Sequence, residues 1–553
     1  MKFATSLLVA ASVLSLLQGC ASTMQPASAS RLPPGQPLSQ CAVTAEPPGR
    51  LNGYFVTATS KTEATVDVEG RTIHYCAWAG RIIVHGPGWH DAGAGDRNNR
   101  TAVPPEAAMF YVAYLKEGER AGQRPITFLF DGGPGSATVW LHMGGLGPRR
   151  VVTRGNAGNA AASSRFVNNE YSLLDASDLV FVDAPGTGFG RIRGKNGGHA
   201  FFGTDADVRA FAGFITQFLS KYDRWSSPKY LVGEGYGALR AAALVNVLET
   251  RDDVDFNGVI FLSQILNFEL LADSSTLETF NPGMDLPYEL ALPSFAATAW
   301  YQRKLPGGSQ PLEPLLERVE RFSLTSYAQA LRQGALLPLL RRDAVAEQLH
   351  EYTGLSVSYI EKADLRIDSG EFEHELLGGS DKTTGELDAR IAGPSLDPLA
   401  ERAGYDPQVA AASSAIVSAF NHYVRGTLHY GYGMTYMPEI SLLGVWNFWH
   451  KPPGQSDPVQ QWPNVMPDLA NAMKYDPGLK VMLNAGYFDL ATPFMNGWYE
   501  MHQLQIPPKL QANISYDYYR SGHMAYVEPP ALERLHDNIA AFIVATDHAS
   551  GDR

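Results

Sequence analysis

The sequence predicts an α/β fold in which a mostly parallel central sheet is flanked by helices and carries an inserted, mainly helical cap. Three observations predict it: short apolar runs that end in glycine-rich turns, helix-forming stretches that follow those turns, and an interruption of this rhythm in the middle of the chain. Strand, tight turn and helix in repetition are typical of a parallel sheet covered by helices. The 553 residues are 45% hydrophobic and 18% charged, a composition typical of a folded protein.

The expected elements follow from local patterns along the chain. β-branched and aromatic runs bounded by turn residues predict strands at an antiparallel edge of the sheet: 54–59, 64–68, 71–75 and 109–114. Apolar runs that lead into strand-end turns predict the other strands: 125–130, 179–182, 229–232, 479–484 and 515–519. Helix-forming or periodic stretches predict helices: 238–244, 313–322, 331–342, 409–423 and 535–543. We therefore expect a core at 51–269 and 446–553, with the cap at 270–445.

The N-terminus has the features of an export signal. Lys2 precedes the apolar run 3–17, which is too short to span a bilayer permanently, and this predicts a signal over residues 1–19. The run ends in Leu-Gln-Gly before Cys20 and resembles a bacterial lipobox, so Cys20 would be lipidated, and the Ala-, Ser- and Pro-rich residues 20–50 would form a tether. We expect an exported chain, lipid-anchored at the periplasmic face of a bacterial membrane. The alternative is a cleaved signal and a soluble periplasmic or secreted protein.

The charge of the chain argues against nucleic-acid binding, and the number and spacing of its cysteines argue against a zinc site. The chain has 44 basic and 57 acidic residues, a net charge of −13 and no basic block, so nucleic acid is not an expected partner. In an exported protein, Cys41 and Cys76 predict a disulfide, with two separate buried thiols as the alternative. No cysteine pair has the spacing of a zinc site, and we expect neither a metal nor an organic cofactor.

Three strand-end turns carry residues in the order that a catalytic triad has in α/β hydrolases. The turn 233–237 comes first, Asp489 follows the strand expected over 479–484, and His523 follows the strand expected over 515–519. Nucleophile, acid and histidine occur in this order in α/β hydrolases, on strand ends that are distant in sequence and close in space. The long gap between residue 237 and Asp489 is where the cap is expected.

Five short motifs, in order, resemble those of the serine carboxypeptidase family in its bacterial branch. The resemblance covers most of the chain after residue 105. The motifs that carry it are Asp131-Gly132-Gly133-Pro134-Gly135-Ser136, Asp183-Ala184-Pro185-Gly186-Thr187-Gly188-Phe189, Gly233-Glu234-Gly235-Tyr236-Gly237, Gly486-Tyr487-Phe488-Asp489 and Gly522-His523-Met524. The family resemblance implies an α/β-hydrolase fold and, as ligand, the C-terminal end of a peptide or protein.

The resemblance also implies roles for individual residues. Asp489 would orient His523, and Nε2 of His523 would take and return the proton of the nucleophile. The backbone N–H groups of Gly133 and Tyr236 would form an oxyanion hole, with glycine at the first position so that a carbonyl can approach the main chain.

The resemblance further implies a pocket that binds the terminal carboxylate of the substrate. Asp131, Gly132 and Glu234 would receive this group by hydrogen bonds, which requires a proton on one of the partners. The family has asparagine where this chain has Asp131. Two carboxylates would then face a third on the substrate, and the three cannot all be ionised at such range.

The main departure from the family lies at the nucleophile. Gly235 stands where the family has serine, and Ser136 lies in the oxyanion turn, where the family has no nucleophile. Loss of the serine predicts an inactive or strongly impaired enzyme. Three explanations stay open: a natural non-catalytic homologue that keeps a peptide-binding cleft, an engineered or erroneous residue at 235, or a water activated by His523 in the vacated space.

A different class of function also fits one local pattern. Gly233-x-Gly235-x-x-Ala238, between a strand and a helix, satisfies the dinucleotide fingerprint. The acids that follow about twenty residues later precede the apolar run 258–262, whereas an acid that binds a ribose should end its strand. Glu234 would also place a negative charge near a pyrophosphate.

Overall fold

The computed structural model describes residues 55, 58–87, 105–152, 165–271, 283–308, 310–442, 444–457 and 462–547. Every described residue belongs to one compact unit, 39–553. The predicted signal, the tether and the lipidation site Cys20 lie outside the described residues. Cys76 in the sheet is disulfide-bonded; Cys41 lies outside the described residues, so the pairing of the two stays a prediction.

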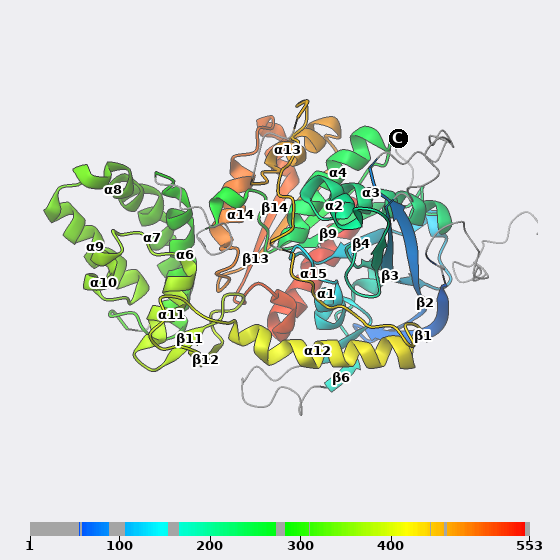
Figure 1. Ribbon diagram of the computed structural model, residues 1–553, viewed down its shortest axis with the longest axis horizontal. Coiled ribbons are helices and arrows are strands. Elements are labelled where there is room, and N and C mark those ends of the chain that lie inside the picture. Colours follow the sequence, from blue (N-terminus) through cyan, green and yellow to red (C-terminus); the bar gives the residue numbers. More distant parts are fainter. Residues whose placement is uncertain are drawn as a thin grey trace, which may run out of the picture. The chain divides into compact units, whose positions relative to one another are not determined.

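A single large sheet organises the described chain (Figure 1). Its strands are β1 (Ser60–Val68), β2 (Arg71–His85), β3 (Glu106–Lys116), β4 (Ile126–Phe130), β7 (Asp178–Val182), β8 (Arg191–Arg193), β9 (Lys229–Glu234), β10 (Gly258–Leu262), β13 (Lys480–Gly486) and β14 (Ile514–Tyr519). They lie in the order β1-β2-β3-β7-β4-β9-β10-β13-β14, with β8 paired to β3. The strands from β7 to β14 are mutually parallel, whereas β1, β2 and β3 pair antiparallel. The parallel sheet with an antiparallel edge is confirmed.

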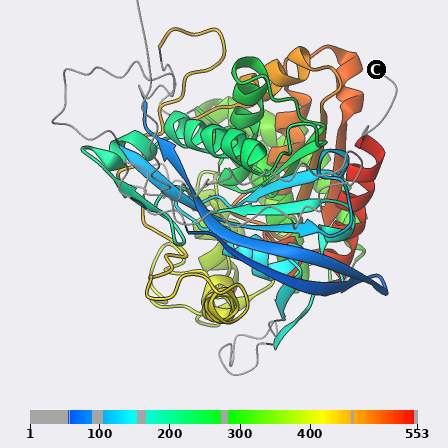
Figure 2. The same ribbon diagram turned by 90° about the vertical axis from the view of Figure 1, so that its right-hand side faces the viewer.

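The central parallel strands β4, β7, β9 and β10 are buried along their whole length because helices cover both faces of the sheet. The helices packed on the sheet or near it are α1 (Val139–Leu141), α2 (Gly197–Phe201), α3 (Thr204–Lys221), α4 (Tyr236–Arg251), α12 (Pro407–Gly426), α13 (Met466–Tyr475), α14 (Phe494–His502) and α15 (Pro529–Thr546). Residues of α3, α4, α13 and α14 belong to one buried apolar cluster, and residues of α1, α12 and α15 belong to another. Figure 2 shows the long β1–β2 hairpin in blue at the edge of this arrangement.

A helical insertion lies beside the sheet, at the left of Figure 1. Its helices are α6 (Leu286–Tyr301), α7 (Leu312–Phe322), α8 (Ala328–Gln333), α9 (Leu339–Thr353), α10 (Val357–Lys362) and α11 (Ser369–Gly378), and they share a third apolar cluster. A small ribbon follows, β11 (Lys382–Thr384) paired with β12 (Ala392–Pro394). A second ribbon, β5 (Arg149–Val152) with β6 (Arg165–Asn168), lies outside the insertion. Although α12 falls within the predicted cap range, it packs with the residues of the sheet.

The structure differs from the predicted elements in two places. The strand expected over 54–59 is not found in its described part, and β1 begins at Ser60. The helix expected over 331–342 is two helices, because α8 ends before Gly334, at φ 50°, and Pro338 precedes α9. Proline keeps the residue before it extended and cannot donate a helical hydrogen bond, so the chain turns here. Within the described ranges, no helix combines the length and apolar character that a membrane span requires.

Candidate functional site

Two of the predicted residues meet at the carboxyl edge of the sheet. Asp489 lies three residues beyond the end of β13, and His523 lies in the turn after the neighbouring strand β14. The ends of adjacent parallel strands lie side by side, which brings the two turns together. Nδ1 of His523 is 2.8 Å from Oδ2 of Asp489, and the Asp489 side chain is fully buried. The carboxylate therefore orients the ring and leaves Nε2 directed away from it.

The turn between β9 and α4 faces the free side of that ring. Gly235 has φ 55° and ψ −120°, a conformation that side chains rarely adopt. A Cβ atom built on Gly235 would lie 3.0 Å from Nε2 of His523. The side chain that this position lacks would therefore point at the imidazole nitrogen.

A Gly235→Ala variant should be less stable than the unaltered chain by about 1–3 kcal/mol, because alanine would adopt a strained conformation and press on the His523 ring. A Gly334→Ala variant is the matched control. Gly334 has nearly the same dihedral angles, with φ 50° and ψ −127°, and a Cβ added there would have no described atom within 4 Å. Urea unfolding of both variants separates backbone strain from the ring contact. Equal losses of unfolding free energy would show that residue 235 does not contact the ring.

The turn after β4 approaches the same place from the other side. Gly133 has φ 107° and follows Gly132, where an added Cβ would lie 2.6 Å from the backbone N of Tyr236. The two main chains thus approach so closely that glycine is required. The next residue with a hydroxyl, Ser136, pairs through its backbone with Glu439, and Ser136 N donates to the Gly132 carbonyl at 3.2 Å.

Sequence patterns did not single out two residues that hold the acid and the histidine. Thr492 donates its backbone N–H to Oδ1 of Asp489 at 2.9 Å, and its hydroxyl lies 2.8 Å from Oδ2. Ser263, just after β10, donates its hydroxyl to the His523 carbonyl at 2.8 Å. The Asp489-x-x-Thr492 spacing is that of a local side-chain turn and could have indicated the first of these contacts. Nothing local indicates the second.

The insertion supplies a further brace through its segment 386–390. Leu387 accepts a hydrogen bond from the backbone N–H of His523 at 2.6 Å, and Ala389 donates to the Phe488 carbonyl at 3.0 Å. One short segment is thus bonded to the turn that carries the histidine and to the turn that carries the acid. The position of the imidazole depends on the insertion as well as on the sheet.

Two buried carboxyl groups, Asp131 and Glu234, lie at the ends of β4 and β9. Oδ1 of Asp131 accepts the N–H of Gly132 at 2.7 Å, and Oε2 of Glu234 accepts the Tyr526 hydroxyl at 2.8 Å. Their other oxygens have no hydrogen-bond partner among the described residues. Burial raises the pKa of Asp131 to about 7, and burial followed by repulsion from Asp131 raises the pKa of Glu234 well above its usual value. The pair therefore retains protons at a pH where exposed carboxyl groups are ionised.

The carboxylates around His523 determine its charge. Burial by itself would lower the pKa of His523, but the Asp489 carboxylate favours the imidazolium, and Glu234 and Asp131 add to this effect when they are ionised. The net result is a pKa of about 9. At neutral pH the ring is a hydrogen-bond donor with a positive charge.

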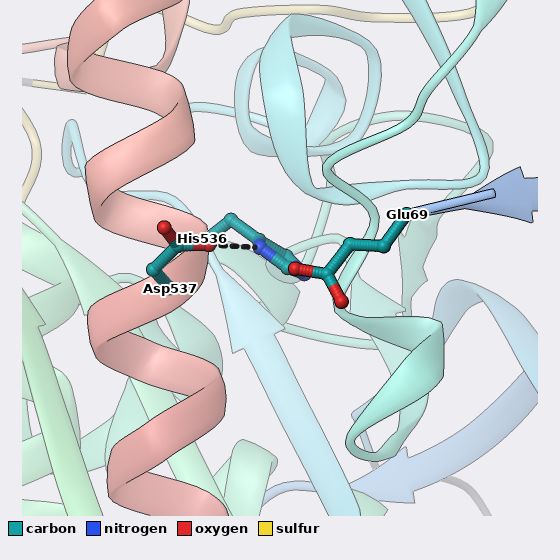
Figure 3. Close-up of side chains that lie close together, drawn as sticks. All are labelled: Glu69, His536 and Asp537. Atoms are coloured by element: carbon teal, nitrogen blue, oxygen red, sulfur yellow. Dashed lines mark hydrogen bonds and ion pairs between the residues drawn. The ribbon is translucent and has the colours of Figure 1, made fainter.

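One cluster offers the residue types that bind metals. Glu69 in the β1–β2 turn lies near His536 and Asp537 of α15 (Figure 3), with one ligand atom from each within 4.8 Å of the others. The His536 ring already has a carboxylate at each nitrogen: Oδ1 of Asp537 is 3.0 Å from Nδ1, and Oδ2 of Asp175 is 3.3 Å from Nε2. A protonated histidine paired with acids accounts for this arrangement, since a metal ligand must leave one nitrogen free of a proton.

The strand order, the three strand-end turns and the inserted helices define an α/β-hydrolase fold. Residues 101–267 match the sequence model of the serine carboxypeptidase family. This segment contains the motifs at 131–136, 183–189 and 233–237, whereas Asp489 and His523 lie beyond it. The family resemblance is thus supported for the first part of the hydrolase core.

One relative and two solved structures are also similar to this chain, at low sequence identity. Serine carboxypeptidase-like 36 of Arabidopsis thaliana is 25% identical over 193 residues, which cover 33% of this chain and 37% of that protein. Kex1(delta)p, a prohormone-processing carboxypeptidase from Saccharomyces cerevisiae, has a TM-score of 0.47 and 14% identity, covering 84% of this chain and 91% of its own. Proline iminopeptidase from Mycobacterium smegmatis has a TM-score of 0.32 and 13% identity, covering 89% and 100%. The fold assignment itself rests on the strand order.

Proposed function

We propose that this chain is a serine carboxypeptidase-like protein that binds the C-terminal end of peptides or proteins, and that Gly235 occupies the position of its nucleophile. The observation that carries the proposal is the 3.0 Å between a Cβ at 235 and Nε2 of His523. A serine there would place its oxygen beside the base, as acyl transfer requires. Without that oxygen, acyl-enzyme turnover is absent or strongly impaired.

The remaining parts of the site would still hold a peptide. The N–H groups of Gly133 and Tyr236 lie on the two main chains that meet beside Gly235, where they would donate to the carbonyl oxygen of the last peptide bond. His523, as an imidazolium, would add a positive charge near the substrate's carboxylate. Asp489 stabilises that charge.

The same charge argues against water activation by His523 in the space that a serine would fill. A general base must be unprotonated at the working pH, and a pKa raised to about 9 keeps the ring mostly protonated near pH 7. Binding is therefore the favoured role at neutral pH.

The dinucleotide alternative gains no support from the local geometry. A Cβ on Gly233 would collide with the Gly237 carbonyl, so the packing of β9 against α4 already requires this glycine. Asp252 follows the end of α4 and precedes β10, whereas a ribose-binding acid would be needed at the carboxyl end of the strand.

Peptide affinity should fall as the pH rises above about 7. Below that pH the carboxyl group of Asp131 is protonated and can donate to the terminal carboxylate; above it, Asp131 is ionised and repels the substrate. A single linked proton predicts about a tenfold loss of affinity per pH unit above the pKa. Fluorescence anisotropy with short peptides that differ in their last residue measures this slope.

Two comparisons make this test specific. Asp131→Asn should bind at high pH with a shallower slope, because an amide donates without titrating. The same peptides with amidated C-termini should bind more weakly at low pH and respond less to pH. Equal binding of free and amidated peptides would exclude a carboxylate pocket at Asp131 and Glu234.

A further inference from the structure

The turn between α8 and α9 exposes an unusual amount of apolar surface. Leu336, Leu339 and Leu340 are 87%, 77% and 87% exposed, and all lie within five consecutive positions. We call residues 334–341 the leucine turn. Single exposed leucines are common on soluble proteins, but three large apolar side chains together typically mark a contact surface.

The leucine turn is a fixed part of the insertion. Leu337 is buried in the insertion's apolar cluster, and its N–H donates to the Gly334 carbonyl at 3.1 Å. With Leu337 turned inward, its neighbours in the chain face outward. Figure 1 shows α8 and α9 at the side of the insertion that is farthest from β13 and β14. The exposed leucines therefore lie on an outer surface, away from the proposed peptide site.

Two arginines lie beside these leucines in the first turn of α9, where a positive charge does not stabilise the helix. Arg341 and Arg342 fall near the start of α9, whose first turn has no acidic residue and whose N-terminus has no side-chain cap. The helix dipole disfavours cations at this end. Arg342 pairs with Asp364 at 2.6 Å, whereas the Arg341 side chain is exposed and donates to Oε1 of Gln329 over 3.4 Å.

A third arginine lies at the other side of the turn. Arg332, in the last turn of α8, is 66% exposed, and its ion pair with Glu289 is 3.9 Å long. The nearest acidic residue along α9, Asp343, comes only after both arginines. The leucine turn is thus flanked by cationic side chains, and its three exposed leucines are not part of the insertion's apolar cluster.

We propose that the leucine turn docks on an anionic lipid surface. The leucines would enter the boundary between headgroups and acyl chains, and Arg332 and Arg341 would lie against lipid phosphates. Apolar side chains on a projecting turn with arginines at its edges are typical of interfacial membrane contacts. The proposal is independent of the proposed peptide site. It fits the predicted lipid at Cys20, which would hold the protein close to a membrane surface.

A local probe tests this proposal on the full chain. Cys20→Ser is combined with Leu340→Cys and an NBD fluorophore, and Leu399→Cys serves as the matched site because Leu399 is also exposed, at 93%. Vesicles of equal parts phosphatidylcholine and phosphatidylglycerol should shift the emission at 340 to the blue and raise it roughly twofold or more, as expected on transfer into an apolar boundary. The probe at 399 should not respond.

Further measurements test whether the response depends on the arginines and on anionic lipid, and whether a second copy of the chain covers the leucine turn. Arg332→Gln with Arg341→Gln should abolish most of the response, and vesicles of phosphatidylcholine alone should give little. An unchanged probe at 340, or an equal response at 399, would overturn the proposal. A response without vesicles that grows with protein concentration would also overturn it, because a second copy of the chain would then cover the turn.

Discussion

Gly235→Ser is expected to convert the chain from a protein that a fluorophosphonate does not label into one that is labelled and removes C-terminal residues from peptides. The serine oxygen would extend from a Cβ that lies 3.0 Å from Nε2 of His523, so the base is already in place. Loss of a triad serine costs about 10⁶ in kcat in enzymes of this chemistry, and the gain should approach that size. Labelling and peptide cleavage by mass spectrometry measure the result.

The pH dependence of kcat and KM of the Gly235→Ser variant distinguishes catalysis by His523 from binding of the substrate's terminal carboxylate. His523 must lose its proton to act as a base, so kcat should rise towards pH 9, whereas carboxylate binding needs protons and KM should rise above about pH 7. Gly235→Ala is the matched control, since it adds the Cβ without the oxygen and should not be labelled. Labelling of the unaltered protein, or sequencing that finds a serine codon at 235, would contradict the account of this position.

Asp489→Asn, placed in the Gly235→Ser background, should lower kcat by about 10⁴. Asp489 accepts the Nδ1 proton of His523 at 2.8 Å and thereby leaves Nε2 available as the base. An asparagine can donate to Nδ1 instead, which favours the tautomer with its proton on Nε2. Single-turnover cleavage of a peptide ester measures the loss, with KM expected to change little.

A second buried pair controls for general destabilisation. Asp468 contacts Nε2 of His450 at 2.9 Å, and both side chains are buried. Asp468→Asn should cost unfolding free energy but leave kcat of the Gly235→Ser variant unchanged. Comparable losses of kcat in both variants would mean that Asp489 acts on stability and not on the histidine.

Much of the fold could be predicted because its signals are local. Parallel strands that are buried on both faces are continuous apolar runs, and the runs before 131, 183 and 233 became β4, β7 and β9. The cap is predictable for a similar reason, since its helical periods interrupt the rhythm of strands. Periodicity did not predict the break in the helix expected over 331–342, although Gly334 and Pro338 were the signals for it.

For the candidate site, too, the residues could be predicted from local motifs, whereas the contacts between them could not. Motifs place Asp489 and His523 at strand ends, but they give no distance between them or to Gly235. They also give no indication that Leu387, from the cap, holds the backbone of His523, or that Ser263 holds its carbonyl. These contacts join segments far apart in the chain, and no local pattern encodes which distant main-chain groups will meet.

The α/β class, the order of the strand-end turns and the absence of a serine at position 235 could be read from the chain alone, because each depends on residue type and on spacing along the chain. Two features became visible only in the folded chain: the backbone at 235 directs a side chain at Nε2 of His523, and Asp131 and Glu234 are buried, each with one oxygen that lacks a hydrogen-bond partner among the described residues. The direction of a side chain and its shielding from water depend on packing between strands, and packing is set by the whole fold.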